Sequence, residues 1–284
     1  MLLGSHLSIA GGMHKALEKA ASCGFNTVAV FVRNQVQWKF SPLSERAVAL
    51  FRRARRRLGI SPVVAHASYL VNLAGSGEVR ERSIAAMVED LSRCGRLGID
   101  YLVFHPGSNG NAALGIALIA DALNRIVAAC PSRRPKILLE TTAGQGNSIG
   151  HTFAQLAEIL SLLARPGRFG ICLDTCHVFA AGYDIRAPRA YRATMAQFDS
   201  LVGLERLLAI HVNDSKRPLA SRVDRHEHIG RGLIGPAGFA NIVNDARLAG
   251  VPLILETPKG LTEDGRNWDE VNAEALRRLV RRGR

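Results

Sequence analysis

The sequence lacks the features that mark membrane, exported and disulfide-stabilised proteins. Its longest apolar stretch, residues 112–123, contains Asp121 and falls short of the ~20 apolar residues that cross a bilayer. Residues 1–6 have neither the charged region nor the long apolar region of a secretory signal. The five cysteines include no C-x-x-C pair, which argues against a disulfide framework and is typical of a reducing cytosol. We therefore expect a cytoplasmic protein with no membrane contact.

Signatures of several other classes are also missing. No glycine-rich dinucleotide fingerprint and no P-loop follows a candidate strand, which disfavours an open nucleotide-binding sheet. No internal repeat, low-complexity tract or proline- and glycine-rich linker divides the 284 residues. Since 47% of the residues are hydrophobic and 21% are charged, the chain can bury a sizeable core. We expect one ordered domain.

Charge of one sign is in excess. The chain has 37 lysines and arginines against 24 acidic residues, for a formal net charge of +13. Such an excess fits a polyanionic partner such as nucleic acid, whose phosphates attract clustered guanidinium groups. The alternative is that the arginine-rich segments 46–57 and 277–284 are solvated helix faces. Composition alone does not separate the two interpretations.

Short apolar runs alternate with longer segments of helical periodicity along the whole chain. Eight runs have the composition of strands: residues 2–9, 27–32, 62–67, 101–105, 136–140, 169–174, 208–212 and 252–256. Near-continuous apolar strands that alternate with helices predict a parallel sheet covered by helices. Eight such units predict a (β/α)8 TIM barrel that spans residues 1–284 as a single domain. The long polar segment 213–236 is a candidate functional loop.

Histidines and carboxylates follow most of the predicted strands. Seven strands end in such a residue directly after apolar residues: His6, His66, His105, Glu140, Asp174, His211 and Glu256. For one strand, an ordinary hydrogen-bonded polar residue at the terminus would be the simpler interpretation. Since the carboxyl ends of barrel strands meet at one mouth, seven such residues indicate a shared site.

These strand-end groups predict a metal site, because clustered carboxylates repel one another unless a cation lies between them. Imidazole mixed with carboxylate is typical of zinc or a related first-row metal. Further donors are His177, three residues after Asp174, and Asp224 with His226 in the long loop. The candidate ligands are therefore His66, His105, Glu140, Asp174, His177, His211, Asp224, His226 and Glu256. This number suits two or three ions with one bridging carboxylate.

Three neighbours of these donors are open to two interpretations each. Cys176 is either a thiolate ligand or, as we favour, a small buried packing residue. Glu227 and His228 either support the ligands or, as we favour, lie at the surface.

The predicted site indicates a reaction class. Multi-metal sites with oxygen and nitrogen ligands typically hydrolyse phosphoesters, because the ions activate water and hold the attacking and leaving oxygens in line. Joined to the basic balance of the chain, this chemistry predicts hydrolysis of a nucleic acid phosphodiester.

Eight sequence blocks resemble the endonuclease IV family (AP endonuclease family 2). They are HLSIAGG (6–12), HASYLVNL (66–73), FHPGS (104–108), ETTAGQG (140–146), CLDTCHVFAAGYD (172–184), HVNDSK (211–216), DRHEHIG (224–230) and ILETP (254–258). Any one block alone would be weak, whereas eight in order along the chain make the resemblance specific.

The resemblance implies a TIM barrel that binds three zinc ions, with manganese as an alternative at one site. It divides the nine ligands into three sets: His66 and His105 with the bridging Glu140; Asp174, His211 and Glu256, which complete the second site; and His177, Asp224 and His226. Glu140 and Glu256 are the implied catalytic residues, since Glu140 bridges two ions and Glu256 is placed to orient the nucleophile as well as to ligate.

The substrate that the resemblance implies is duplex DNA. Members of the family cut on the 5′ side of an abasic site, leave a 3′-hydroxyl and also trim blocked 3′ ends, as base excision repair requires. The ions would activate the attacking water and neutralise charge on the leaving oxygen. We expect a monomer.

The resemblance also implies DNA contacts in two loops at the mouth. The candidate DNA-binding residues are Asn34, Gln35, Gln37, Trp38, Tyr69 and Asn72. Apolar and amide groups in such loops enter the minor groove and fill the space of the extruded nucleotide. Ordinary rim packing is the alternative for Trp38 and Tyr69. Two departures from the family pattern, Val36 for a basic wedge residue and Asn109 for a histidine, bear on DNA affinity and not on the metal set.

Two other functions fit parts of the pattern. A metal-dependent sugar isomerase or epimerase resembles this barrel, but it would need fewer histidines and a less basic surface. A DNA-binding protein with structural metals and no chemistry would not need donors at all nine positions.

Overall fold

Eight parallel strands form the centre of the protein in a computed structural model that describes residues 1–35, 37–38 and 41–281. The strands are β1 (Leu3–Ser5), β2 (Val28–Phe31), β3 (Val63–His66), β4 (Tyr101–Phe104), β5 (Lys136–Glu140), β6 (Phe169–Asp174), β7 (Leu207–His211) and β10 (Leu253–Leu255). They lie in the order β1-β10-β7-β6-β5-β4-β3-β2. A parallel bridge between His6 and Ala29 brings the two outer strands together. The predicted TIM barrel is confirmed.

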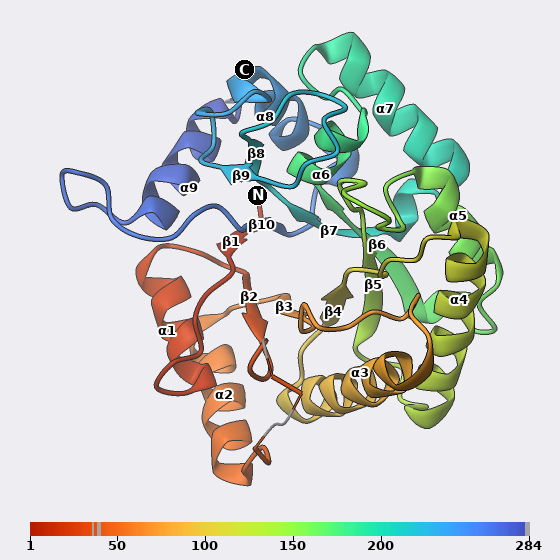
Figure 1. The fold of residues 1–284 in the computed structure, drawn as a ribbon. Coiled ribbons are helices and arrows are strands. Elements are labelled where there is room, and N and C mark those ends of the chain that lie inside the picture. Colours follow the sequence, from red (N-terminus) through yellow and green to blue (C-terminus); the bar gives the residue numbers. More distant parts are fainter. Residues whose placement is uncertain (36, 39–40, 282–284) are drawn as a thin grey trace.

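Helices surround the strands (Figure 1). They are α1 (Met13–Ser22), α2 (Glu45–Leu58), α3 (Gly77–Leu97), α4 (Ala112–Ala129), α5 (Phe153–Ser161), α6 (Thr175–Ala181), α7 (Pro188–Leu201), α8 (Gly235–Val243) and α9 (Trp268–Leu279). Local signals set their ends. The side chain of Ser44 accepts a hydrogen bond from the backbone N–H of Ala47 and caps α2, which ends at Gly59 with φ of 66°.

Helix α4 is long and apolar enough to cross a membrane by length and composition alone. In the structure it packs between α3 and α5, with Ile119, Leu123 and Ile126 fully buried. Its outer face carries two charged residues that pair with α3, since Asp121 accepts a hydrogen bond from Arg80 at 2.5 Å and Arg125 donates to Glu81 at 2.7 Å. The helix therefore has the burial pattern of a barrel-covering helix.

The barrel interior is filled by side chains from seven of the strands. They are Ala29, Val64, Val103, Leu138, Cys172, Ala209 and Ile254, and each is at most 1% exposed. The alternate strand residues pack against the surrounding helices in a second, larger core. Polar side chains at the carboxyl ends of the strands therefore stand on an apolar floor, where their charges are poorly screened.

The predicted polar loop 213–236 contains a short antiparallel hairpin. Strand β8 (Asp214–Ser215) pairs with β9 (His226–Glu227). The buried carboxylate of Asp214 accepts hydrogen bonds from the N–H groups of Gly230 and Ile234, both at 2.9 Å. This hairpin returns the chain over the barrel mouth and positions Asp224 and His226 there.

Candidate metal centre

The structure brings all nine predicted donors together at the carboxyl ends of the strands. Their nitrogen and oxygen atoms fall into overlapping groups in which all atoms lie within 4.8 Å of one another. The groups of nitrogen and oxygen donors include His66 with His105 and Glu140; Glu140 with Asp174, His211 and Glu256; and Asp174 with His177 and His226. Asp224 lies in a further group with His226 and Cys176.

Glu140, the last residue of β5, lies at the centre of the cluster and is fully buried. Its Oε2 lies 2.9 Å from Nε2 of His66 and 3.2 Å from Nε2 of His105. Its Oε1 lies 2.7 Å from Nδ1 of His211 on the other side. The two carboxylate oxygens therefore face two different donor groups, as a bridging ligand requires.

Asp174 and His177 are held together by the start of α6. Asp174 caps this helix, because its Oδ1 accepts a hydrogen bond from the N–H of His177 at 2.8 Å. Its Oδ2 accepts a hydrogen bond from Nδ2 of Asn213 at 2.6 Å. Across the mouth, Oδ2 of Asp224 lies 3.0 Å from Nε2 of His177, and its Oδ1 lies 3.3 Å from Nε2 of His226.

Three imidazoles have one nitrogen fixed by a backbone carbonyl. Nδ1 of His66 lies 2.7 Å from the Ala67 carbonyl, Nδ1 of His177 lies 2.8 Å from Thr141 O, and Nδ1 of His226 lies 3.1 Å from Glu256 O. Since a carbonyl only accepts, each Nδ1 donates its proton, and the lone pair of a neutral ring is on Nε2. This arrangement is typical of metal-ligating histidines.

The Nε2 atoms of three imidazoles in the cluster are left without a hydrogen bond. Those of His177, His211 and His226 are buried and lack a hydrogen-bond partner in the part of the chain that the structure describes. Buried polar atoms are normally satisfied, and the Nε2 atoms of His177 and His226 face the carboxylate of Asp224, so these two nitrogens fit a cation. His211 instead faces the carboxylates of Glu140 and Glu256 with its Nδ1 atom.

The electrostatics of the pocket favour positive charge. Burial opposes ionisation of Glu140, but His211 and His105 outweigh it and hold the pKa of Glu140 well below its usual range. Burial likewise disfavours protonation of His177, but Asp174 and Asp224 outweigh it and raise the pKa of His177 well above its usual value. Buried carboxylates that stabilise a proton on imidazole would stabilise a multivalent cation more strongly.

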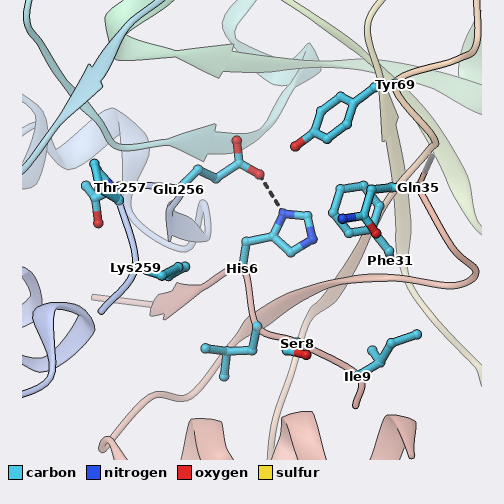
Figure 2. Close-up of a pocket in the computed structure, with 11 residues that line it drawn as sticks. His6, Ser8, Ile9, Phe31, Gln35, Tyr69, Glu256, Thr257 and Lys259 are labelled. Atoms are coloured by element: carbon cyan, nitrogen blue, oxygen red, sulfur yellow. Dashed lines mark hydrogen bonds and ion pairs between the residues drawn. The ribbon is translucent and has the colours of Figure 1, made fainter. Parts of the chain in front are cut away.

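Two hollows open at the mouth on either side of Tyr69. One, of about 380 Å³, is lined by His6, Phe31 and Glu256, and the other, of about 530 Å³, by His105 and Asp224 among other residues. Figure 2 shows the first hollow, with the Tyr69 hydroxyl directed toward Glu256. Burial and the carboxylates of Glu256 and Glu140 raise the pKa of Tyr69 to about 12, so its hydroxyl is a neutral donor.

His6 belongs to this site, although no ligand role was predicted for it. Its Nδ1 lies 2.8 Å from Oε1 of Glu256 (Figure 2), and its ring packs on Phe31 with 4.4 Å between centroids. Its position after β1 placed it among the seven strand-end residues, but its contact with Glu256 depends on tertiary structure. His6 therefore orients Glu256.

The predicted DNA-contact loop after β2 is tied to the barrel by its backbone. The Gln35 carbonyl accepts a hydrogen bond from Ser68 Oγ at 2.6 Å, and the Gln37 carbonyl accepts one from Arg33 Nη1 at 3.0 Å. These two bonds use the backbone carbonyls of the glutamines and not their side-chain amides. Asn34 is exposed. Val36, where a basic wedge residue is common, lies outside the described residues.

The remaining predicted DNA-contact residues differ in how far they are engaged in packing. Trp38 is partly buried against the core. The side chain of Asn72 joins two loops, since its Oδ1 accepts from Ser108 N at 3.0 Å and its Nδ2 donates to Ser108 O at 3.2 Å. Asn109 has a similar role, because its Nδ2 donates to the Ala74 carbonyl at 2.7 Å.

Cys176 and His228 lie at the edge of the cluster. Burial strongly raises the pKa of the Cys176 thiol, which favours the predicted packing role over a thiolate. His228 is only 9% exposed and stacks on Trp268 with 3.7 Å between ring centroids. The predicted surface position of His228 is therefore wrong.

Comparisons with known proteins place the chain in a family. Residues 17–281 match the family described as xylose isomerase-like TIM barrel. The chain is 50% identical over 283 residues to probable endonuclease 4 of Geobacter sulfurreducens, covering 99% of this chain and 95% of that protein. The chain belongs to the endonuclease IV family. The family resemblance of the eight sequence blocks is therefore confirmed. Because the family consists of endonucleases, this endonuclease IV homologue is a nuclease.

Solved structures agree with this assignment. Endonuclease IV from Thermus thermophilus superposes with a TM-score of 0.88 at 36% identity, and the match covers 98% of each chain. A D-tagatose 3-epimerase-like protein superposes with a TM-score of 0.74 at 19% identity, covering 98% of this chain and 97% of the other. The epimerase likeness shows a shared fold alone.

Proposed function

We propose that this endonuclease IV homologue is a DNA repair enzyme. It hydrolyses the phosphodiester on the 5′ side of an abasic site to leave a 3′-hydroxyl, and it trims blocked 3′ ends. Residues 1–284 act as a single nuclease domain, as a monomer in the cytoplasm. Family membership supports nuclease chemistry, and the donor cluster at the barrel mouth supports metal-assisted hydrolysis of a phosphodiester.

The observation that carries the proposal is the orientation of the imidazoles. His66, His177 and His226 each donate Nδ1–H to a backbone carbonyl, so that each Nε2 lone pair faces the carboxylates of the mouth. Three rings that are fixed in this way around shared carboxylates support a metal role for the cluster.

The nine residues would hold three zinc ions, with manganese as an alternative at one of them. His66 and His105 would share an ion with Glu140; Glu140, Asp174, His211 and Glu256 would hold the second; and His177, Asp224 and His226 would hold the third. Bound ions of this kind activate water and neutralise charge on the attacking and leaving oxygens of a phosphodiester.

The residues of the chain supply the geometry. Glu140 spans two of the donor groups and sets the spacing between them. Glu256 is held between His6 and His211, with its Oε2 3.1 Å from Nδ1 of His211, which fixes it for orienting the nucleophile. The apolar floor of the barrel keeps bulk water away from this pocket and strengthens its electrostatic interactions.

Recognition of damage would use the mouth and its loops. The hollows beside Tyr69 would receive the abasic nucleotide, and flipping is cheapest where the base is already missing. Asn34, Gln35, Gln37 and Trp38 would enter the minor groove. Asn72, whose amide is engaged with Ser108, would act through the loop that it supports.

The deciding experiment is incision of a duplex oligonucleotide with a single tetrahydrofuran abasic analogue. We expect cleavage 5′ to the analogue, no cleavage of the matched undamaged duplex, and loss of activity after chelation. Zinc-loaded protein that leaves the analogue intact but epimerises a sugar would establish the rival function. Uncleaved substrate with normal duplex binding would instead indicate a binding protein with structural metals.

A further inference from the structure

A separate hollow of about 500 Å³ lies at the amino ends of β5 and β6, at the opposite end of the barrel from the metal centre. Its walls come from the segment 131–136, which leads into β5, and from the 3₁₀-helix η1 (Pro166–Arg168), which leads into β6. The nine donors lie at the carboxyl ends of the strands, so none of them reaches this hollow. It is a feature that the proposed nuclease chemistry does not use.

The hollow is strongly cationic. Four of its seven lining residues are basic and none is acidic: Arg133, Lys136, Arg165 and Arg168. Within the described ranges of the chain, no carboxylate forms an ion pair with any of these four. Uncompensated like charges repel one another, so a bound anion would stabilise the arrangement.

Arg168 makes the hollow a preformed site. Its side chain is buried, and its two terminal nitrogens donate to the carbonyls of Cys130 at 3.1 Å and Pro135 at 3.2 Å. Its buried Nε has no hydrogen-bond partner among the described residues. Burial lowers the pKa of Arg168, and the charge of Arg165 acts in the same direction. The guanidinium is thus fixed between two loops without a counter-charge.

A second basic cluster lies on the same end of the barrel. A hollow of about 360 Å³ at the amino ends of β3 and β4 is lined by Arg52, Arg55 and Arg56 of α2. Asp100 neutralises Arg55 through an ion pair of 2.6 Å, but Arg52 and Arg56 are exposed and have no ion pair within the described chain. Since neighbouring strands lie about 4.8 Å apart, the two basic hollows are roughly 10 Å apart at the level of the sheet.

We propose that the Arg133–Lys136–Arg165–Arg168 hollow binds the phosphodiester backbone of duplex DNA, remote from the metal centre. Guanidinium and ammonium groups without acidic partners recognise phosphate oxygens of any sequence. A DNA duplex is long enough to contact this hollow and also the arginines of α2 that line the second hollow. A free phosphate ion is small enough to fit within a single hollow. The hollow would bind an undamaged stretch of DNA while the barrel mouth remains free to bind another stretch.

The test compares two charge-reversed variants that change the net charge equally. Arg133→Glu/Arg165→Glu alters exposed residues of the hollow. Arg277→Glu/Arg278→Glu alters exposed residues in the last turn of α9, next to Gly24 at the same end of the barrel but away from β5 and β6. Fluorescence anisotropy measures binding of an undamaged duplex over a range of salt concentrations. The duplex has about 30 base pairs, which is roughly three helical turns. We expect the hollow variant to weaken binding roughly tenfold and to reduce the salt slope by about 2, with a much smaller change for the α9 variant.

Each other outcome overturns the proposal. Equal weakening in both variants would mean that only overall charge matters, and unchanged binding in the hollow variant would exclude a DNA contact there. Loss of inorganic phosphate binding by calorimetry, with duplex binding intact, would assign the hollow to free phosphate. Arg133→Gln/Arg165→Gln repeats the measurement if the charge-reversed variant fails to fold. Because undamaged DNA is used, the result is independent of abasic-site incision.

Discussion

The two ends of the barrel strands differ in the side chains that they carry and in how those side chains are held. At the carboxyl end, buried histidines and carboxylates are held by directional bonds to backbone groups. At the amino end, arginines and a lysine line two hollows, and among the described residues Arg168 is held by backbone carbonyls and Arg55 by Asp100. Reaction geometry needs orientation and attraction of a polyanion needs only charge, so under the two proposals the contrast would separate catalysis from affinity.

The separation predicts which measurements respond to change at each end. Substitutions at the carboxyl end should alter turnover or metal content while duplex binding persists. Substitutions at the amino end should alter salt-dependent binding while turnover on a short abasic duplex persists.

The largest effect is expected for Glu140→Gln. The amide keeps the size of the side chain but removes the charge that faces both donor groups. We expect incision of the abasic analogue to fall about a thousandfold, since metal-assisted charge stabilisation contributes several kcal/mol, with duplex binding retained. Single-turnover kinetics and anisotropy measure the two quantities. Glu158→Gln on the exposed face of α5 is the matched control, and unchanged turnover in Glu140→Gln would remove it from the bridging role.

The second-largest effect is expected for removal of the metal ions. Chelation should abolish incision and lower the melting temperature by roughly 5–10 °C, because ions bound to the folded state alone stabilise it and the four carboxylates then repel. Duplex binding at the amino end should persist, which sharpens the comparison. Calorimetry with and without added zinc measures the shift, and an unchanged melting temperature would contradict a tightly held metal.

Acid should release the metals from the same site. Carboxylates raise the pKa of His177 above its usual value of about 6.5, so protons compete for its Nε2 atom at a higher pH than for a free imidazole. Falling pH therefore favours the protonated, metal-free ring. Elemental analysis after dialysis at a series of pH values should show metal content that falls as the pH is lowered, whereas full retention through pH ~5 would oppose this coupling.

A smaller effect is expected for His6→Ala. The histidine orients Glu256 and is not itself one of the nine donors. Outer residues of this kind typically change activity or metal affinity roughly 10- to 100-fold, and we expect a loss near the lower figure. Partial rescue by His6→Gln, which restores a donor, would separate orientation of Glu256 from packing on Phe31. His14→Ala on α1 is the control, and full activity in His6→Ala would leave His6 with a packing role.

The strand pattern predicted the barrel well because buried parallel strands are apolar at nearly every position. The predicted bounds 136–140 and 169–174 coincide with β5 and β6. The predicted strand 2–9 is longer than β1, because the ladder with β10 ends at Ser5 and the pairing of His6 and Leu7 with Ala29 is the last contact with β2. A local pattern does not record where an apolar segment stops pairing.

The nine donors were predictable because each follows an apolar run or lies in a family-like block. Their environment was not, because it depends on contacts between distant residues. The carbonyl of Glu256 that fixes His226 is 30 residues away in sequence. Trp268, which covers His228, is 40 residues along the chain, and no local signal indicates that stack. The charge excess likewise did not reveal that Arg52, Arg56, Arg133 and Arg165, which have no ion pair with a described residue, line hollows at the amino end.

The bridge between His6 and Ala29 has a consequence for motion in the barrel. Every other pair of neighbouring strands is joined by a ladder, but β1 and β2 meet outside the ladders. Their contacts include this bridge, the bond from Leu7 N to Ala29 O and the bonds between Leu3 and Asn26, which precedes β2. Local opening of the barrel would therefore begin between β1 and β2, where the amide protons should exchange sooner than those of the other strands. Since Nδ1 of His6 also contacts Oε1 of Glu256, opening between β1 and β2 and disorder of the Glu256 carboxylate would be one event.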